Sequence, residues 1–257
     1  MNLFYREYGT EHEQHLIILH GLFGMSDNWI GHAKAFARQY HVVVPDMRNH
    51  GQSPHSDDFS FELMAEDLKK LMAKLEIEHC VLLGHSMGGR LAMNFSLDYP
   101  ERVDKLIVAD MSLRKGKIRP EHRAILSVLS LLKLSDKKNY GEIDESLKRF
   151  ISNERRRQFV LKNIVHTSEG FKWKINPGAL VRNIDKIMPE LKSEKRYTKA
   201  ALFIRGGASD YILDTDIPAI KEHFPQARIE TIEGASHWLH ADNPVAFRQL
   251  VQEFLEQ

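Results

Sequence analysis

Six short apolar runs, rich in Val, Ile and Leu, recur along the chain and end at or near Gly, Pro or Asp. They cover residues 16–21, 42–46, 80–86, 105–110, 201–207 and 227–234. Runs of this length are too short for helices and are typical of strands buried on both faces. Amphipathic helical patterns lie between them, at 61–77 and 90–100. This alternation predicts an α/β fold with a mostly parallel central sheet flanked by helices.

The alternation is interrupted once, in the middle of the chain. Helical patterns at 122–134 and 143–165, followed by the segment 171–180, occupy this interval. We expect an all-helical insertion that covers an active site as a lid. It divides the chain into a first core segment (1–112), a helical cap (113–197) and a second core segment (198–257).

The insertion is basic although the whole chain carries a net charge of only +1. Residues 113–197 contain 21 Lys or Arg against 10 Asp or Glu, a net charge of +11, and the remainder has a net charge of −10. Such a segment is either a solvated helical surface or a face for an anionic ligand. It carries no helix-turn-helix, zinc-finger or aromatic RNA-binding pattern, so we expect no nucleic-acid partner.

Other features of the sequence narrow the class of protein. Cys80 is the only cysteine, which excludes an internal disulfide and favours a reducing compartment. No apolar run approaches the ~18 residues that cross a bilayer, and residues 1–15 show no signal-peptide pattern. No phosphate loop, dinucleotide fingerprint or metal motif is present. We therefore expect a soluble cytoplasmic protein without membrane, metal or cofactor, and the sequence does not indicate its oligomeric state.

The stretch GHSMGG (84–89) follows an apolar strand and opens a helix, and it matches the pattern Gly-x-Ser-x-Gly. In that context the serine lies at a sharp turn, and Gly84 and Gly88 are needed because a Cβ would clash with neighbouring backbone. The turn exposes Ser86 Oγ at the carboxyl edge of the sheet. The backbone N–H of Met87 is then placed to donate to an oxyanion.

A base and an acid follow Ser86 in the order Ser, Asp, His. His237 lies in a Gly/Ala/Ser loop after the last predicted strand, where it would take the serine proton. Two residues are candidates for the acid. Asp110 ends the strand that follows the nucleophile helix, and Asp210 lies just beyond the strand at 201–207.

The stretch HGLFG follows the first predicted core strand. Its glycines let the backbone approach a substrate carbonyl, so we expect the N–H of Leu22 to join that of Met87 in an oxyanion hole. His20 would orient this loop, and the polar residues after the 42–46 strand would brace it. The apolar side chains that could line an acyl pocket are Phe23, Met25, Trp173 and Trp238.

The combined motifs resemble the α/β-hydrolase superfamily, most closely the YbfF-type bacterial esterases. The matching stretches are HGLFGMSDNW (20–29), PDMRNHGQSP (45–54), GHSMGGRLAM (84–93), LIVAD (106–110), ALFIRGGASDYI (201–212) and FPQARIETIEGASHWLHADNP (224–244). The resemblance implies Ser86 as nucleophile, His237 as base and Asp110 as acid. Because of this resemblance we favour Asp110 as the acid. This chain departs from its relatives in also carrying an acid at Asp210, which therefore stays the alternative.

A serine nucleophile with a base and an oxyanion hole performs acyl transfer through an acyl-enzyme. The resemblance implies activity on short-chain esters and acyl-CoA thioesters, so the expected partner is a small ester or thioester. Two alternatives remain, because a fold does not fix a function. They are C–C bond hydrolysis or a lyase reaction on the same fold, and a ligand sensor without turnover.

Overall fold

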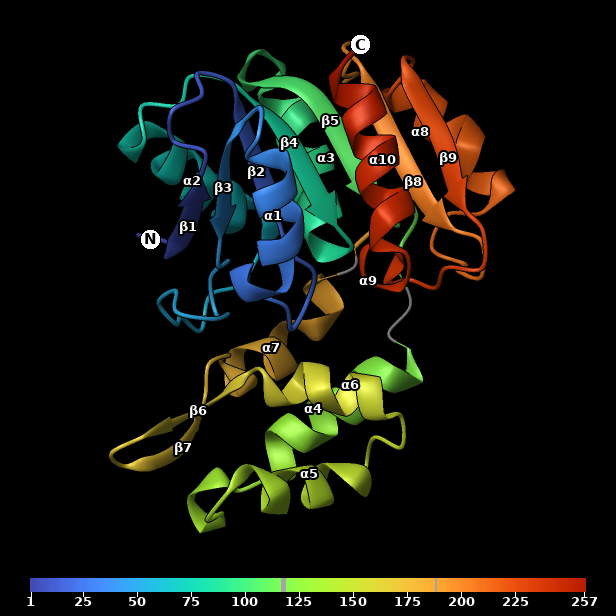
Figure 1. Cartoon of the computed structure of the whole chain (residues 1–257). Coiled ribbons are helices and arrows are strands. Elements are labelled where there is room, and N and C mark those ends of the chain that lie inside the picture. Colours follow the sequence, from blue (N-terminus) through green and yellow to red (C-terminus); the bar gives the residue numbers. More distant parts are fainter. Residues whose placement is uncertain (117–118, 188) are drawn as a thin grey trace.

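The computed structural model describes residues 1–116, 119–187 and 189–257. Its centre is a seven-stranded sheet in the order β1-β3-β2-β4-β5-β8-β9, in which every pair of neighbours is parallel except β1 and β3 (Figure 1). The strands are β1 (Tyr5–Tyr8), β2 (His15–Leu19), β3 (His41–Pro45), β4 (Cys80–His85), β5 (Val103–Ala109), β8 (Ala201–Gly206) and β9 (Ala227–Ile232). The predicted mostly parallel α/β fold is confirmed.

The inner strand β2 shows why both faces of the sheet are covered. Leu16 and Ile18 point to one face and pack in a cluster with Phe36 of α1 and Phe247 of α10. The alternate residues of β2 pack in the cluster that contains the apolar stripes of α2, α3 and α8 on the other face. These helices are α1 (Ile30–Phe36), α2 (Phe61–Lys74), α3 (Met87–Asp98), α8 (Ile217–His223) and α10 (Pro244–Leu255).

Strand β1 was not predicted from the sequence. It lies at the edge of the sheet and pairs antiparallel with β3, with Tyr5 opposite Pro45. Its sequence YREY is only partly buried and contains no aliphatic residue. It therefore lacks the apolar run that identified the other six strands.

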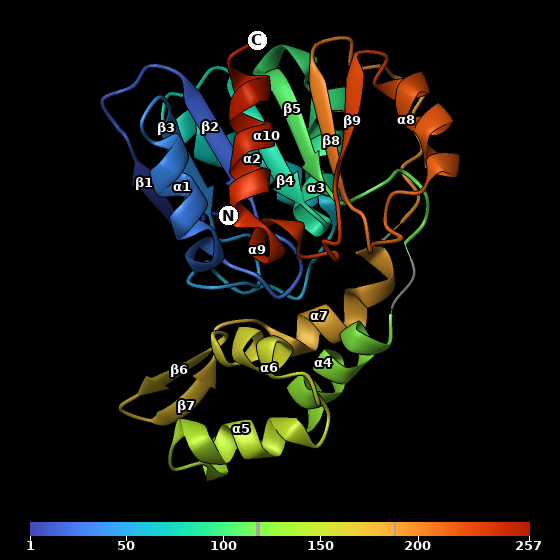
Figure 2. The same cartoon turned by 45° about the vertical axis from the view of Figure 1, so that its right-hand side comes forward.

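The insertion forms a cap at the carboxyl edge of the sheet (Figures 1 and 2). Its helices are α4 (Pro120–Leu131), α5 (Tyr140–Lys148), α6 (Glu154–Leu161) and α7 (Pro177–Asn183). The expectation that the insertion is all-helical is wrong, because β6 (Ile164–Thr167) and β7 (Gly170–Trp173) form an antiparallel hairpin within it. The division at residues 113 and 197 stays a prediction.

Local sequence explains why the helical pattern at 143–165 breaks. The side chain of Asn153 accepts a hydrogen bond from the N–H of Arg156, so it starts a new helix at α6. Gly170 has φ of +100°, a conformation that glycine adopts readily, and it allows the tight turn between β6 and β7. Ile164 then pairs with Trp173 across the hairpin.

Short helical segments complete the chain. They are α9 (Leu239–Asp242) and 3-10 turns at Ser26–Trp29, Pro100–Arg102, Leu134–Asp136, Ile184–Lys186 and Asp214–Asp216. Across residues 1–116, 119–187 and 189–257, none of the helices combines the length and apolarity that crossing a bilayer requires.

Candidate active site

Ser86 lies at the turn between β4 and α3, with φ of 53° and ψ of −116°. This unusual backbone is possible because the flanking residues have no side chains. A Cβ on Gly84 would be 2.2 Å from the carbonyl oxygen of Gly88, and a Cβ on Gly88 would be 2.2 Å from that of Leu19. The pattern Gly-x-Ser-x-Gly is therefore required by backbone contacts on both sides of the serine.

The structure brings Ser86, His237 and Asp110 together. His237 Nε2 lies 2.9 Å from Ser86 Oγ, and His237 Nδ1 lies 2.8 Å from Asp110 Oδ2. In the neutral imidazole, the Nδ1–H donates to the carboxylate, and this leaves Nε2 to accept the serine proton. His237 thus links Asp110 and Ser86, which lie 127 and 151 positions before it in the sequence, into one hydrogen-bonded relay.

Asp110 is completely buried at the end of β5 and has φ of 48°. Its Oδ1 accepts the N–H of Gly206, and its Oδ2 accepts the hydroxyl of Ser209 as well as the N–H of His237. Burial raises the pKa of Asp110 to about 6, and the hydrogen bonds from Ser209 and Gly206 oppose that rise. The carboxylate is therefore mostly ionised at pH 7, and both of its oxygens accept hydrogen bonds.

Asp210, the alternative acid, is placed differently. Its carboxylate is 64% exposed and forms an ion pair with Arg119 of the cap. Arg119 is also the main reason why the pKa of Asp210 is lowered. Since Asp110 and not Asp210 contacts the imidazole, the geometry favours Asp110 as the acid.

The ring of His237 is fixed on several sides. Tyr211 stacks on it with a centroid distance of 3.5 Å and an interplanar angle of 10°. His85 donates from Nε2 to the backbone carbonyl of His237 over 2.8 Å. Desolvation lowers the pKa of His237 to about 3, and His122 and Arg119 act in the same direction. The imidazole is thus neutral at pH 7, as a general base must be.

The loop HGLFG lies against the turn that carries Ser86. A Cβ on Gly21 would be 2.9 Å from His85 Nδ1 and 3.3 Å from Ser86 Cβ, so only glycine allows this approach. His20 accepts the N–H of Met47 at Nε2 and donates from Nδ1 to the carbonyl of Gly21, as expected for a residue that orients the loop.

The two predicted oxyanion donors are free to act. Among the residues that the structure describes, neither the N–H of Leu22 nor that of Met87 donates to another protein atom. Leu22 precedes Phe23, and Met87 is the first residue of α3. Both N–H groups therefore remain available for a substrate oxygen.

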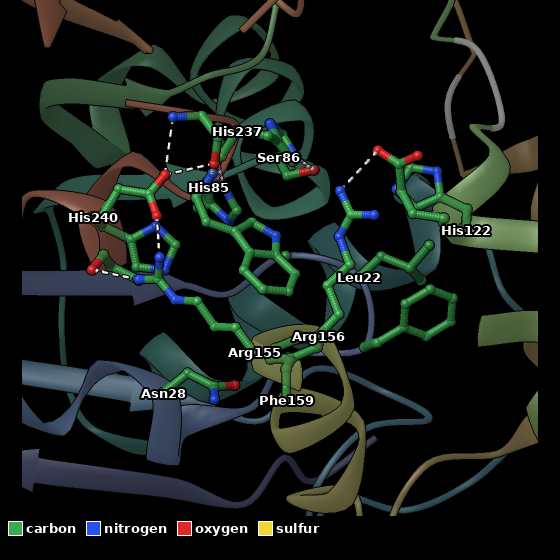
Figure 3. Close-up of a pocket in the computed structure, with 18 of the residues that line it drawn as sticks. Leu22, Asn28, His85, Ser86, His122, Arg155, Arg156, Phe159, His237 and His240 are labelled. Atoms are coloured by element: carbon green, nitrogen blue, oxygen red, sulfur yellow. Dashed lines mark hydrogen bonds and ion pairs between the residues drawn. The ribbon is translucent and has the colours of Figure 1, made fainter. Parts of the chain in front are cut away.

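A pocket of about 600 Å³ lies between the carboxyl edge of the sheet and the cap, which is within the usual range for small-molecule sites (Figure 3). Phe23 and Trp238 line it, as predicted. Met25 and Trp173 do not. Met25 is buried, and Trp173 packs on the hairpin of the cap against the apolar core.

Basic side chains of the cap line this pocket, but several of them already have acidic partners. Arg119 pairs with Asp210, and Arg155 pairs with Asp242. Arg156 lies 3.8 Å from Glu121. Figure 3 shows Arg155 and Arg156 among the residues that line the pocket. The excess positive charge of the cap is thus partly neutralised at the pocket.

Sequence reasoning missed several residues that shape the site. Arg119 lies 4.1 Å above the ring of Tyr211, which in turn covers His237. Arg155 contacts the loop that carries His237. No motif marked these positions, because their importance depends on how the cap is placed over the core. In the part of the chain that the structure describes, no cluster of three or more His, Cys, Asp or Glu is arranged to hold a metal ion.

Comparison with known proteins agrees with this geometry. A profile of the alpha/beta hydrolase fold matches residues 14–133. The sn-1-specific diacylglycerol lipase ABHD11 of Mus musculus is 36% identical over 247 residues, which are 93% of this chain and 80% of that protein. Esterase YbfF of Escherichia coli K12 is 30% identical over 250 residues, 96% of each chain.

A solved structure extends the comparison to three dimensions. The structure described as a marine microorganism esterase has a TM-score of 0.95 and 43% identity, and the match covers 99% of each chain. The resemblance predicted from the sequence motifs is confirmed. The chain belongs to the α/β-hydrolase family.

Proposed function

We propose that the protein hydrolyses carboxylic esters through an acyl-enzyme on Ser86, as a carboxylesterase-type serine hydrolase. The observation that carries the proposal is the relay from Ser86 Oγ to His237 Nε2 and from His237 Nδ1 to Asp110, at distances of 2.9 and 2.8 Å. This relay faces a pocket of about 600 Å³. The esterases and the lipase among its relatives support the same reaction class.

Acylation begins when Ser86 Oγ attacks the carbonyl carbon of the ester. His237 Nε2 accepts the hydroxyl proton as the bond forms, and Asp110 stabilises the resulting imidazolium through Nδ1–H. The N–H groups of Leu22 and Met87 donate to the oxyanion of the tetrahedral intermediate. His237 then gives its proton to the leaving alcohol as the C–O bond breaks.

Deacylation repeats the same sequence with water as the nucleophile. His237 takes a proton from water, the hydroxide oxygen attacks the acyl carbon, and Ser86 leaves with the proton returned by His237. Loss of one oxyanion donor typically slows such reactions by about 10²–10³-fold. The N–H groups of Leu22 and Met87 should therefore make a large contribution to the rate, in addition to that of Ser86, His237 and Asp110.

Esters are the first candidate substrate, and thioesters of an anionic carrier such as CoA are the second. The observation that favours the second is the basic lining of the pocket, where Arg156 is only loosely paired and Lys162 adds another positive charge. A small ester or thioester is thus the proposed partner. The buried, single Cys80 suits a reducing, cytoplasmic location.

Repeated turnover tests the proposal. The wild-type protein should cleave p-nitrophenyl acetate and butyrate over many cycles, and Ser86→Ala should abolish that activity. A single slow turnover would instead support a ligand sensor. A panel of acyl-CoAs and simple esters of matched chain length, with a diacylglycerol included, would identify the preferred leaving group. Inactivity on all of them, with turnover of a C–C substrate, would support the other alternative.

A further inference from the structure

Helix α6 of the cap and Asn163, which follows it, together contact both loops on which the proposed chemistry depends. Arg155 donates to the carbonyl of Ala241 over 2.7 Å and pairs with the carboxylate of Asp242, in the segment that follows His237. Phe159 packs against Trp238, with ring centroids 5.0 Å apart. Residues four apart share one face of a helix, so this face of α6 lies along the pocket (Figure 3).

Asn163, four residues after Phe159 and just beyond the end of α6, continues the row formed by Arg155 and Phe159. Its Nδ2 donates to the carbonyl of Phe23 over 2.9 Å, across the boundary between cap and core. The Asn163 side chain is buried, with 1% of its surface exposed. Its amide nitrogen lies 3.3 Å from a second carbonyl, that of Phe159, so the group that faces both oxygens must be the donor.

The backbone of Asn163 is itself held on both sides. Its N–H donates to the carbonyl of Val160 over 2.9 Å, and its carbonyl accepts the N–H of Lys174 over 2.7 Å. The first contact joins Asn163 to α6, and the second joins it to the end of the hairpin. The donor therefore sits on a fixed part of the cap and not on a free loop.

The residue that Asn163 contacts has a strained backbone. Phe23 has φ of 61°, in the left-handed region that residues with a Cβ rarely adopt. Its N–H donates to His50 Nε2 over 3.2 Å, and its carbonyl accepts from Asn163. One hydrogen bond from the core and one from the cap thus hold the two peptide groups of Phe23. Such a conformation persists only where its surroundings fix it.

We propose that Asn163 is a positioning residue for the oxyanion hole. Phe23 directly follows Leu22, so the conformation of Phe23 sets the direction of the loop that presents the Leu22 N–H. By holding the carbonyl of Phe23, the cap keeps that donor aligned with the position where charge develops. The inference rests on the proposed function, and it gives the cap a part in transition-state stabilisation beyond substrate binding.

The first test compares two buried asparagines of the cap. Asn183 resembles Asn163 in that its Nδ2 donates to a core carbonyl, that of Asp57, over 3.1 Å, but it does so away from both catalytic loops. Asn163→Leu should lower kcat for p-nitrophenyl butyrate about 10- to 100-fold with little change in KM. Asn183→Leu should leave kcat within about twofold. Rates are normalised to active sites titrated with a fluorophosphonate.

A transition-state analogue separates positioning from general damage to the fold. Ser86 Oγ adds to the carbonyl carbon of a propyl trifluoromethyl ketone, and the oxyanion of the resulting hemiketal occupies the oxyanion hole. For Asn163→Leu its inhibition constant should rise by the same factor by which kcat/KM falls, because both measure transition-state binding. Asn163→Ala, which removes the amide donor without adding a charge or a larger apolar side chain, should behave likewise and covers the case in which the leucine variant does not fold.

Three results would overturn the inference. They are a rise in KM with kcat unchanged, an inhibition constant for the ketone that does not move, and equal losses of kcat in the Asn163 and Asn183 variants. Failure of the proposed function gives a different result, because the wild-type protein would then show neither turnover nor labelling of Ser86.

Discussion

The loops at the carboxyl edge of the sheet and the cap that faces them line the same pocket, but different contacts hold them. In the core, backbone packs against backbone so closely that a Cβ on Gly84 or Gly88 would overlap a neighbouring backbone atom. The cap docks instead through side chains, such as the ion pairs of Arg155 with Asp242 and of Arg119 with Asp210.

This difference in contacts suggests different roles for the two regions: the core loops hold the reacting groups, and the cap modulates substrate binding and rate. Close backbone packing leaves few alternative positions for Ser86, so the reacting groups are preorganised. Exposed ion pairs are individually weak, at about 0–1 kcal/mol each, so the docking of the cap can change with sequence and with bound substrate. Changes to the closely packed catalytic loops of the core should therefore abolish catalysis, whereas changes in the cap should alter its rate more moderately.

The largest expected effect is on the acid of the relay. Asp110→Asn should lower kcat about 10⁴-fold, because the amide no longer accepts the Nδ1–H of His237 and favours the wrong tautomer. Asp210→Asn, which removes an exposed partner of Arg119, should change kcat by less than about fivefold. Steady-state kinetics on p-nitrophenyl butyrate measures both. A nearly silent Asp110→Asn would show that the assignment of the acid is wrong.

The next effect concerns the close packing of the core. Gly88→Ala should destabilise the fold by about 1–3 kcal/mol and reduce activity sharply, because the new Cβ would overlap the carbonyl of Leu19. Gly31→Ala is the matched control, since no atom outside α1 lies within 4 Å of its Cβ and alanine favours the helix. Urea unfolding followed by circular dichroism checks both. Equal stability of the two variants would contradict the comparison.

A smaller effect is expected in the cap. Arg155→Ala removes the ion pair to Asp242 and the hydrogen bond to Ala241, which together steady the segment after His237. Because the Arg155 side chain is 55% exposed, the pair is partly screened by solvent and kcat/KM should fall by less than about fivefold. A loss as large as that of Asp110→Asn would mean that the cap performs chemistry and does not only adjust it.

The smallest expected effect is a shift of the pH profile. Arg119 lowers the pKa of both His237 and Asp110, so replacing this cation raises both values. In Arg119→Met the acid limb of kcat/KM should therefore move to higher pH, by up to about one unit. Arg182→Met, which removes a cap arginine paired with Asp57 far from the relay, should leave the limb in place. A shift to lower pH would contradict the electrostatic account.

The parts of the site that could be predicted from sequence are those fixed by local rules. The turn at Ser86 follows from two glycines between a strand and a helix, and His237 follows from its place after the last strand, β9. The apolar runs identified six strands, including the edge strand β9, whereas β1 was missed because its sequence YREY contains no aliphatic residue.

The remaining features depend on packing between distant segments. Asp110 directly follows β5 and Asp210 lies a few residues beyond β8, and only the folded structure shows that Asp110 reaches the imidazole. The hairpin at 164–173 has no uniform apolar run, so a helix was expected there. Asn163 is one of several polar residues in a basic segment, and its contact with Phe23 appears only when cap and core are placed together.

The central claim is that the hydroxyl at position 86 is the nucleophile, and covalent labelling tests it most directly. The native protein is treated with a fluorophosphonate, digested, and analysed by mass spectrometry while ester turnover is followed in parallel. We predict one adduct, on the peptide that contains Ser86, with activity lost in proportion to labelling and no adduct in Ser86→Ala. Full labelling of Ser86 with turnover retained, or an adduct at another residue that accounts for the lost activity, would contradict the account.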